Sequence, residues 1–165
     1  MAPTVRTPTV KSMEMTNHAQ SRRHYQLGLP LWQVAALAAL AMPRALVHDA
    51  GVSVPGPVQA LLVVVPPAIW VAVAVLRRIP TPVTTLLVVG GLYGLGLAVV
   101  HNLYWSEAFG DRPPELGGNL AGQLAPGTEE LVLRIAATAS SLLTGLVVGL
   151  ICGLVAALAV RLKSR

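Results

Sequence analysis

The stretch ATASSLLTGLVVGLICGLVAALAV, residues 137–160, contains no charged side chain and is apolar apart from a few hydroxyl groups. A small residue recurs in it at every fourth position, a spacing that lines these residues up along one side of an α-helix. Stripes of small residues let two helices in a membrane approach each other closely. The stretch therefore predicts a membrane-spanning helix with a packing face. The members of this stripe are Ala137, Ser141, Gly145, Gly149, Gly153 and Ala157.

The composition of the whole chain agrees with this prediction. Of its 165 residues, 54% are hydrophobic and only 12% are charged, and the mean hydropathy is +0.65. Soluble domains carry roughly 25% charged residues, because their surface has to be hydrated. The composition therefore predicts an all-α, polytopic integral membrane protein. The basic residues are mostly Arg, and Ala, Gly and Pro are abundant, which indicates a GC-rich bacterial genome.

Four apolar stretches are long enough to cross a bilayer, which takes about 20 helical residues. The first stretch is interrupted by Pro43 and Arg44, so we expect it to continue through a proline kink toward His48. Short connections place neighbouring spans antiparallel, and the prediction is an up-down-up-down bundle of four transmembrane helices. The predicted spans are residues 29–47, 58–76, 83–104 and 131–160.

The charges divide between the two sides of this predicted bundle. Segments 1–28, 77–82 and 161–165 hold nine basic residues and one acid, whereas the opposite side holds six acids and Arg112. The positive-inside rule then places both termini in the cytoplasm, so we expect a protein of the cytoplasmic membrane. Because the basic residues flank apolar segments and form no single patch, nucleic acid is not an expected partner.

Three segments lie outside the predicted spans. Residues 1–28 are polar and show no helical period, so we expect a flexible cytoplasmic arm before an uncleaved first span. Residues 106–130 form a long outer loop rich in Pro and Gly, and residues 161–165 form a basic cytoplasmic tail. Loops of such length are often functional or mobile.

The third span carries a shorter stripe of small residues, Gly90, Gly94 and Ala98, which we expect to pack antiparallel on the stripe of the fourth span. In that register His101 and Arg134 would meet near the outer membrane face. The fourth span could instead pair with another subunit in a homo- or hetero-oligomer. The predicted packing residues are Gly90, Gly94, Ser141, Gly145, Gly149 and Gly153.

Polar residues gather near the predicted outer ends of the spans. Arg44, His48, His101 and Arg134 are the candidates for a mouth that binds an ion or small ligand, because ionisable residues within a membrane are costly and often functional. The alternative is that the arginines extend to the interface and form salt bridges at the rim.

Cofactor and metal sites are not expected. His48 and His101 could in principle face each other across a haem, but the sequence has no C-x-x-C-H attachment motif and no Glu-x-x-His pair. Pro66 and Pro67 predict a kink in the second span, with hydroxyl groups of the fourth span available to its freed carbonyls.

Motifs of soluble enzymes, such as a phosphate-binding loop, a nucleophile elbow or a zinc-binding helix, are absent, so the chain is not expected to be an enzyme. The leading hypothesis is an accessory or interaction subunit of a bacterial membrane system. A small transporter or channel component with an outward-facing polar mouth is the alternative. A membrane redox protein with a bis-histidine cofactor is the third hypothesis.

Overall fold

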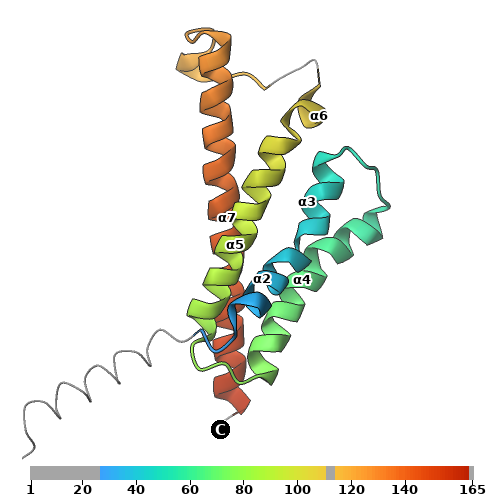
Figure 1. The fold of residues 1–165 in the computed structure, drawn as a ribbon, viewed down its shortest axis with the longest axis vertical. Helices are drawn as coiled ribbons and strands as arrows, with labels where there is room; N and C mark the ends of the chain where they lie inside the picture. Colours follow the sequence, from blue (N-terminus) through green and yellow to red (C-terminus); the bar gives the residue numbers. More distant parts are fainter. Residues whose placement is uncertain (1–26, 111–113, 164–165) are drawn as a thin grey trace, which may run out of the picture.

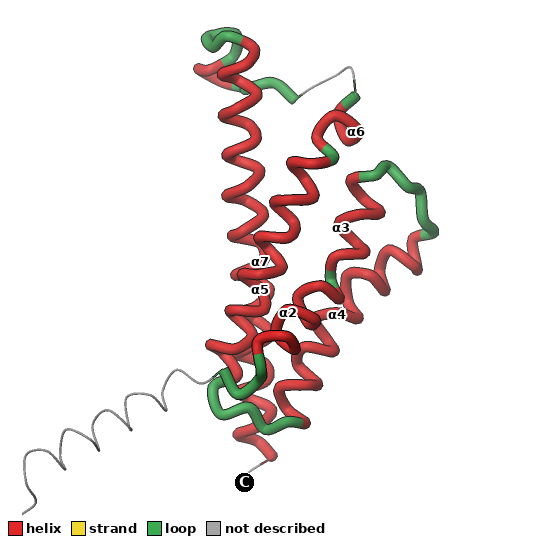
Figure 2. Tube along the Cα trace, in the orientation of Figure 1, coloured by secondary structure: helices red, strands yellow, loops and turns green. Residues whose placement is uncertain are grey.

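The computed structural model of the chain describes residues 27–110 and 114–163. These residues form helices and loops and no strand, which confirms the all-α prediction (Figures 1 and 2). Most of the predicted arm, residues 1–26, lies outside the described residues, as do 111–113 and 164–165. Four helical segments are long and apolar enough to cross a membrane, as predicted. These are Leu31–Asp49, α4 (Gly56–Leu76), α5 (Pro82–Leu103) and α7 (Pro126–Lys163).

The first apolar segment is divided into two helices. Helix α2 covers Leu31–Leu40 and α3 covers Met42–Asp49, with Ala41 between them. Pro43 stands in the first turn of α3, where its missing amide hydrogen breaks no helical hydrogen bond. The predicted proline kink is therefore present, and it lies just before the proline.

The last helix begins earlier than its apolar stretch. Helix α7 starts at Pro126, and the amides of Thr128 and Glu129 bond the Ala125 carbonyl. Proline favours the first position of a helix, and an acid in the first turn interacts well with the helix dipole. Polar residues thus extend the fourth helix into the predicted outer loop. That loop also contains the short helix α6 (Trp105–Phe109) and a 3₁₀ turn, Gly118–Leu120.

Helices α5 and α7 lie side by side and are held in close contact by glycine (Figure 1). A Cβ atom built on Gly90 would lie 2.2 Å from the Gly145 carbonyl oxygen, and one built on Gly94 would lie 2.8 Å from the Ser141 carbonyl oxygen. Toward the other end of this contact, a Cβ on Gly153 would lie 2.7 Å from the Val83 Cα. The two stripes of small residues therefore face each other in antiparallel register within one chain.

Helix α4 lies against α7 and the α2–α3 segment. Trp70 of α4 is fully buried, and its indole nitrogen donates a 2.8 Å hydrogen bond to the Leu37 carbonyl near the end of α2. The edge of its ring meets Tyr93 of α5, with 6.0 Å between the ring centroids. Trp70 therefore connects α4 to α2 and to α5.

The chain enters and leaves these helices at the end opposite to α6. Thr85 is fully buried near the start of α5, and its single hydroxyl hydrogen is shared between the Leu27 carbonyl at 2.5 Å and the Thr81 carbonyl at 2.9 Å. Helix α4 ends at Leu76, Arg78 in the following turn has a positive φ of 48°, and Ile79 is buried. These contacts fix the start of α2 against the α4–α5 connection.

Candidate functional site

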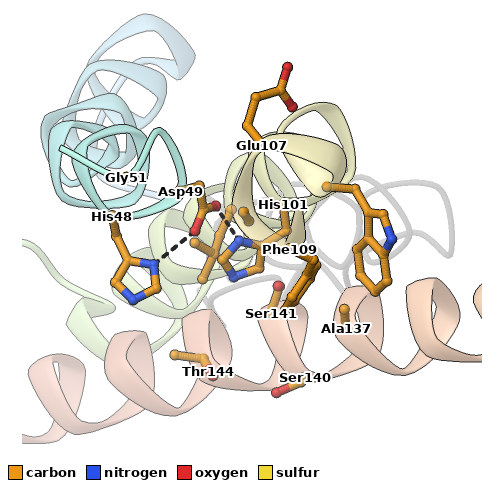
Figure 3. Close-up of a pocket in the computed structure, with 13 residues that line it drawn as sticks. His48, Asp49, Gly51, His101, Glu107, Phe109, Ala137, Ser140, Ser141 and Thr144 are labelled. Carbon is orange, nitrogen blue, oxygen red and sulfur yellow. Dashed lines mark hydrogen bonds and ion pairs between the residues drawn. The ribbon is translucent and has the colours of Figure 1, made fainter. Parts of the chain in front are cut away.

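A polar cavity lies at the end of the molecule that carries α6, which we call the α6 end. Toward this end α5 leans away from α7, and the last turn of α3 is also found there (Figure 1). The cavity has a volume of about 420 Å³. Its walls come from α3 and the residue after it, α5, α6 and α7 (Figure 3). The lining residues are His48, Asp49, Gly51, Leu97, His101, Trp105, Glu107, Ala108, Phe109, Ala137, Ser140, Ser141 and Thr144.

Asp49 is the central side chain of this cavity. Its carboxylate is only 4% exposed, and each of its oxygens pairs with a different imidazole (Figure 3). His48 Nδ1 lies 2.9 Å from Oδ1, and His101 Nδ1 bonds Oδ2. His48 comes from the same turn of α3, whereas His101 comes from α5. The carboxylate therefore joins two helices that are far apart in the sequence.

The hydrogen bonds to Asp49 also determine which ring nitrogen of each histidine donates a hydrogen bond and which can accept one. An ionised carboxylate only accepts hydrogen bonds, so each Nδ1 atom carries the shared proton. In a neutral imidazole the Nε2 atom is then left as an acceptor. His48 is 63% exposed and His101 is 33% exposed, so these acceptors are within reach of a solute. The three side chains form a group rich in hydrogen-bond acceptors.

The position of Asp49 is unfavourable for the helix itself. It stands in the last turn of α3, where the carbonyl end of the helix dipole repels a negative charge. The helix closes just beyond it through Gly51, whose φ of +65° suits glycine, and the Val52 amide bonds the Val47 carbonyl. A buried acid at this location needs the two imidazoles to compensate for lost hydration.

Helix α7 contributes hydroxyl groups to the opposite wall. Ser141 is buried, and its Oγ has no hydrogen-bond partner among the described residues. Figure 3 shows Ser141 on the side of α7 that faces His101, whereas Ser140 lies on the other side. Buried hydroxyls are normally paired, so an unpaired one at a cavity is a place for a bound group. The predicted contact of these hydroxyls with the freed carbonyls of α4 is not found among the described hydrogen bonds.

Of the four residues predicted to form the mouth, two line this cavity and two do not. His48 and His101 are on its wall. Arg44 lines a neighbouring hollow of about 340 Å³ between α3 and the start of α4, and its buried Nε has no partner among the described residues. Arg134 lies outside the cavity, with its guanidinium carbon 4.8 Å from the centre of the Trp105 ring.

The expected meeting of His101 with Arg134 has to be corrected. The described contacts join His101 to Asp49, whereas Arg134 bonds the Asn102 carbonyl at 3.0 Å and Glu130 at 2.8 Å. Toward the α6 end α5 leans away from α7 (Figure 1), and His101 lies on the cavity wall beside Asp49 (Figure 3). The longer side chain of Arg134 spans this separation one residue further along α5.

Sequence reasoning missed the central residue of the site. Asp49 was visible as an acid at the end of an apolar span beside His48, and a buried acid there is the signal that could have identified it. The aromatic wall of Trp105 and Phe109, whose ring centroids lie 4.8 Å apart, carried no such signal, since aromatic residues are common at span ends.

Comparison with known protein families, curated proteins and solved structures finds no match to this chain. Within residues 27–110 and 114–163, no group of three or more His, Cys, Asp or Glu side chains has the arrangement needed to hold a metal ion.

Proposed function

We propose that this chain is a four-span protein of a bacterial cytoplasmic membrane, with an up-down-up-down topology and both termini in the cytoplasm. We further propose that it is the solute-binding component of a small transport system. The observation that carries this function is the buried carboxylate of Asp49, held by two imidazoles at the wall of a 420 Å³ cavity. A purely structural acid would have no need of an adjoining cavity.

The distribution of charge supports the orientation. Arg78 from the α4–α5 connection and Lys163 from the end of α7 line one small hollow, so basic residues distant in sequence gather at one end. At the α6 end, Glu115, Glu129 and Glu130 line another hollow. Basic residues concentrate on the cytoplasmic side of membrane proteins. The cavity of Asp49 would then open toward the outside of the cell.

Accessibility to a membrane-impermeant thiol reagent tests this proposal. The native thiol is removed by Cys152→Ala, and single cysteines are then introduced by Ala137→Cys in the cavity, Asn119→Cys beyond the α6 end and Leu162→Cys at the opposite end. In intact cells we expect modification at positions 137 and 119, and at 162 only after permeabilisation. Modification at 162 in intact cells would contradict the orientation. Protection of 137 while 119 reacts would show that no solute reaches the cavity.

The accessory-subunit hypothesis is the second candidate, and the apolar surface of α4 favours it. In the apolar 18-residue stretch of α4 only 17% of the residues are buried inside the molecule, compared with 50% in the corresponding stretch of α5. Between α4 and α7 lies an open apolar groove of about 780 Å³, lined by residues such as Ala68, Ala72 and Val155. The small side chains would admit a transmembrane helix of a partner protein. Ala72→Trp would fill the groove, and release of a stoichiometric membrane partner by the folded variant would support this function.

A further inference from the structure

The acidic and aromatic side chains around the cavity indicate which class of solute it would bind. We propose that the cavity binds a small organic cation: a compound with an ammonium group beside Asp49 and an apolar part against Phe109. This inference rests on the proposed function, because it concerns the same cavity. It adds the charge and chemical type of the solute.

The ionisable groups on the wall favour a cation. Asp49 is the buried acid, and the exposed Glu107 is a second acid at the edge of the cavity, with its carboxylate directed away from Asp49 (Figure 3). His48 and His101 present acceptor nitrogens while neutral, and none of the described lining residues is Lys or Arg. Of the two nearest arginines, Arg134 pairs with Glu130. Arg44 lines a neighbouring hollow that shares His48 and Gly51 with the cavity, and it does not line the cavity itself. A wall of acids and acceptors attracts positive charge, and the surrounding low dielectric strengthens the attraction.

The hydrogen-bonding groups favour an N–H donor over a bare ion. Each carboxylate oxygen of Asp49 accepts one hydrogen bond from an imidazole, and each can accept a further one. The unpaired Oγ of buried Ser141 and the Nε2 atoms of the histidines add acceptors. An ammonium group offers up to three donors to such a set, whereas the described side chains lack the grouped ligands that a metal ion requires.

The aromatic wall suits the rest of such a molecule. Phe109 lines the cavity and is 40% exposed as a residue, and its ring packs against the buried Trp105. Arg134 already occupies the neighbourhood of the Trp105 ring, so the accessible aromatic surface is that of Phe109. Aromatic rings attract cations and also cover apolar groups. A volume of about 420 Å³ is enough for an amine with one aromatic ring or a short alkyl chain.

Two thiol reagents of opposite charge test the proposal on the full chain in membranes. The thiol introduced by Ala137→Cys in the Cys152→Ala background is modified by trimethylammonium-ethyl or sulfonato-ethyl methanethiosulfonate. Rates are divided by those of Asn119→Cys, which corrects for the intrinsic reactivity of each reagent. We expect the corrected rate of the cationic reagent to exceed that of the anionic one by about tenfold at low ionic strength. Phenethylammonium should slow the cavity reaction, and 3-phenylpropionate, its counterpart of opposite charge, should not.

Neutralising the acids then identifies the source of the preference. Asp49→Asn keeps the size and an acceptor oxygen, and we expect it to remove most of the roughly tenfold preference. If that variant fails to fold, Glu107→Gln, an exposed substitution, should still reduce the preference by about twofold to threefold. Equal corrected rates for both reagents, or a preference for the sulfonate, would overturn the cation proposal while solute access stands. If neither reagent modifies 137 while both modify 119, the cavity is closed and the proposed function fails as well.

Discussion

Replacing Gly145 by alanine should separate α5 from α7 and destabilise the fold. The new Cβ would lie 2.2 Å from the Gly90 carbonyl oxygen and 2.6 Å from the Gly94 Cα. Ordinary contact begins near 3.4 Å, so the helices would have to move apart by about 1 Å. Overpacking of this kind costs about 1–3 kcal/mol, because a rigid backbone cannot yield as a flexible side chain does.

Gly91→Ala is the matched control for this substitution. Its Cβ would lie 3.5 Å from a Leu146 methyl group, which is ordinary contact. Both substitutions add one methyl group to a helix interior, and both gain about 1 kcal/mol of helix propensity. The difference in stability between the two variants therefore isolates the cost of the close approach of α5 and α7.

The native thiol supplies the assay, because Cys152 is buried in α7. Maleimide modification in mild detergent reports how often this part of the fold opens. A difference of about 1–3 kcal/mol corresponds to a rate ratio of roughly 5- to 150-fold between Gly145→Ala and Gly91→Ala. Equal rates for the two variants, with unchanged helicity by circular dichroism, would refute the close glycine contact.

Three further substitutions test other contacts of the fold. Trp70→Phe should cost about 1–3 kcal/mol in the same assay, because it leaves the Leu37 carbonyl without its indole donor. Thr85→Val should cost about 1 kcal/mol and speed hydrogen exchange at Gly28–Leu31, since the hydroxyl holds the Leu27 carbonyl. Arg134→Gln should cost about 1 kcal/mol through its lost bond to the Asn102 carbonyl. The maleimide assay measures this cost, and equal rates for Arg134→Gln and the wild type would show that the bond adds no stability.

The parts of the fold that depend on periodicity could be predicted from the sequence. Four apolar segments and two stripes of small residues are local patterns, and small residues at every fourth position favour a close contact between helices. The bounds were harder to predict where polar residues continue a helix. Pro126 and Glu129 start α7 through capping and dipole effects, to which hydropathy is insensitive.

The site could be predicted only in part, because it depends on how helices diverge. The stripes of α5 and α7 fix their register near Gly90 and Gly145, but not the angle at which they separate beyond Gly94. That angle decides whether His101 meets Arg134 across a tight contact or faces an open space. A sequence pattern specifies which face of a helix is buried and leaves such an angle to the packing of several helices at once.

Asp49 breaks two local preferences at once, and this supports the proposal that its role is more than structural. It is an acid at the carbonyl end of a helix, and it is buried. Each of these costs free energy, and an asparagine could bond both imidazoles in almost the same space without the charge. A chain whose other local choices agree with its fold is expected to break such rules mainly at functional sites. If Asp49 is only structural, Asp49→Asn should leave the cation preference unchanged, whatever its effect on stability. If it binds cations, the substitution should raise or preserve stability while that preference is lost.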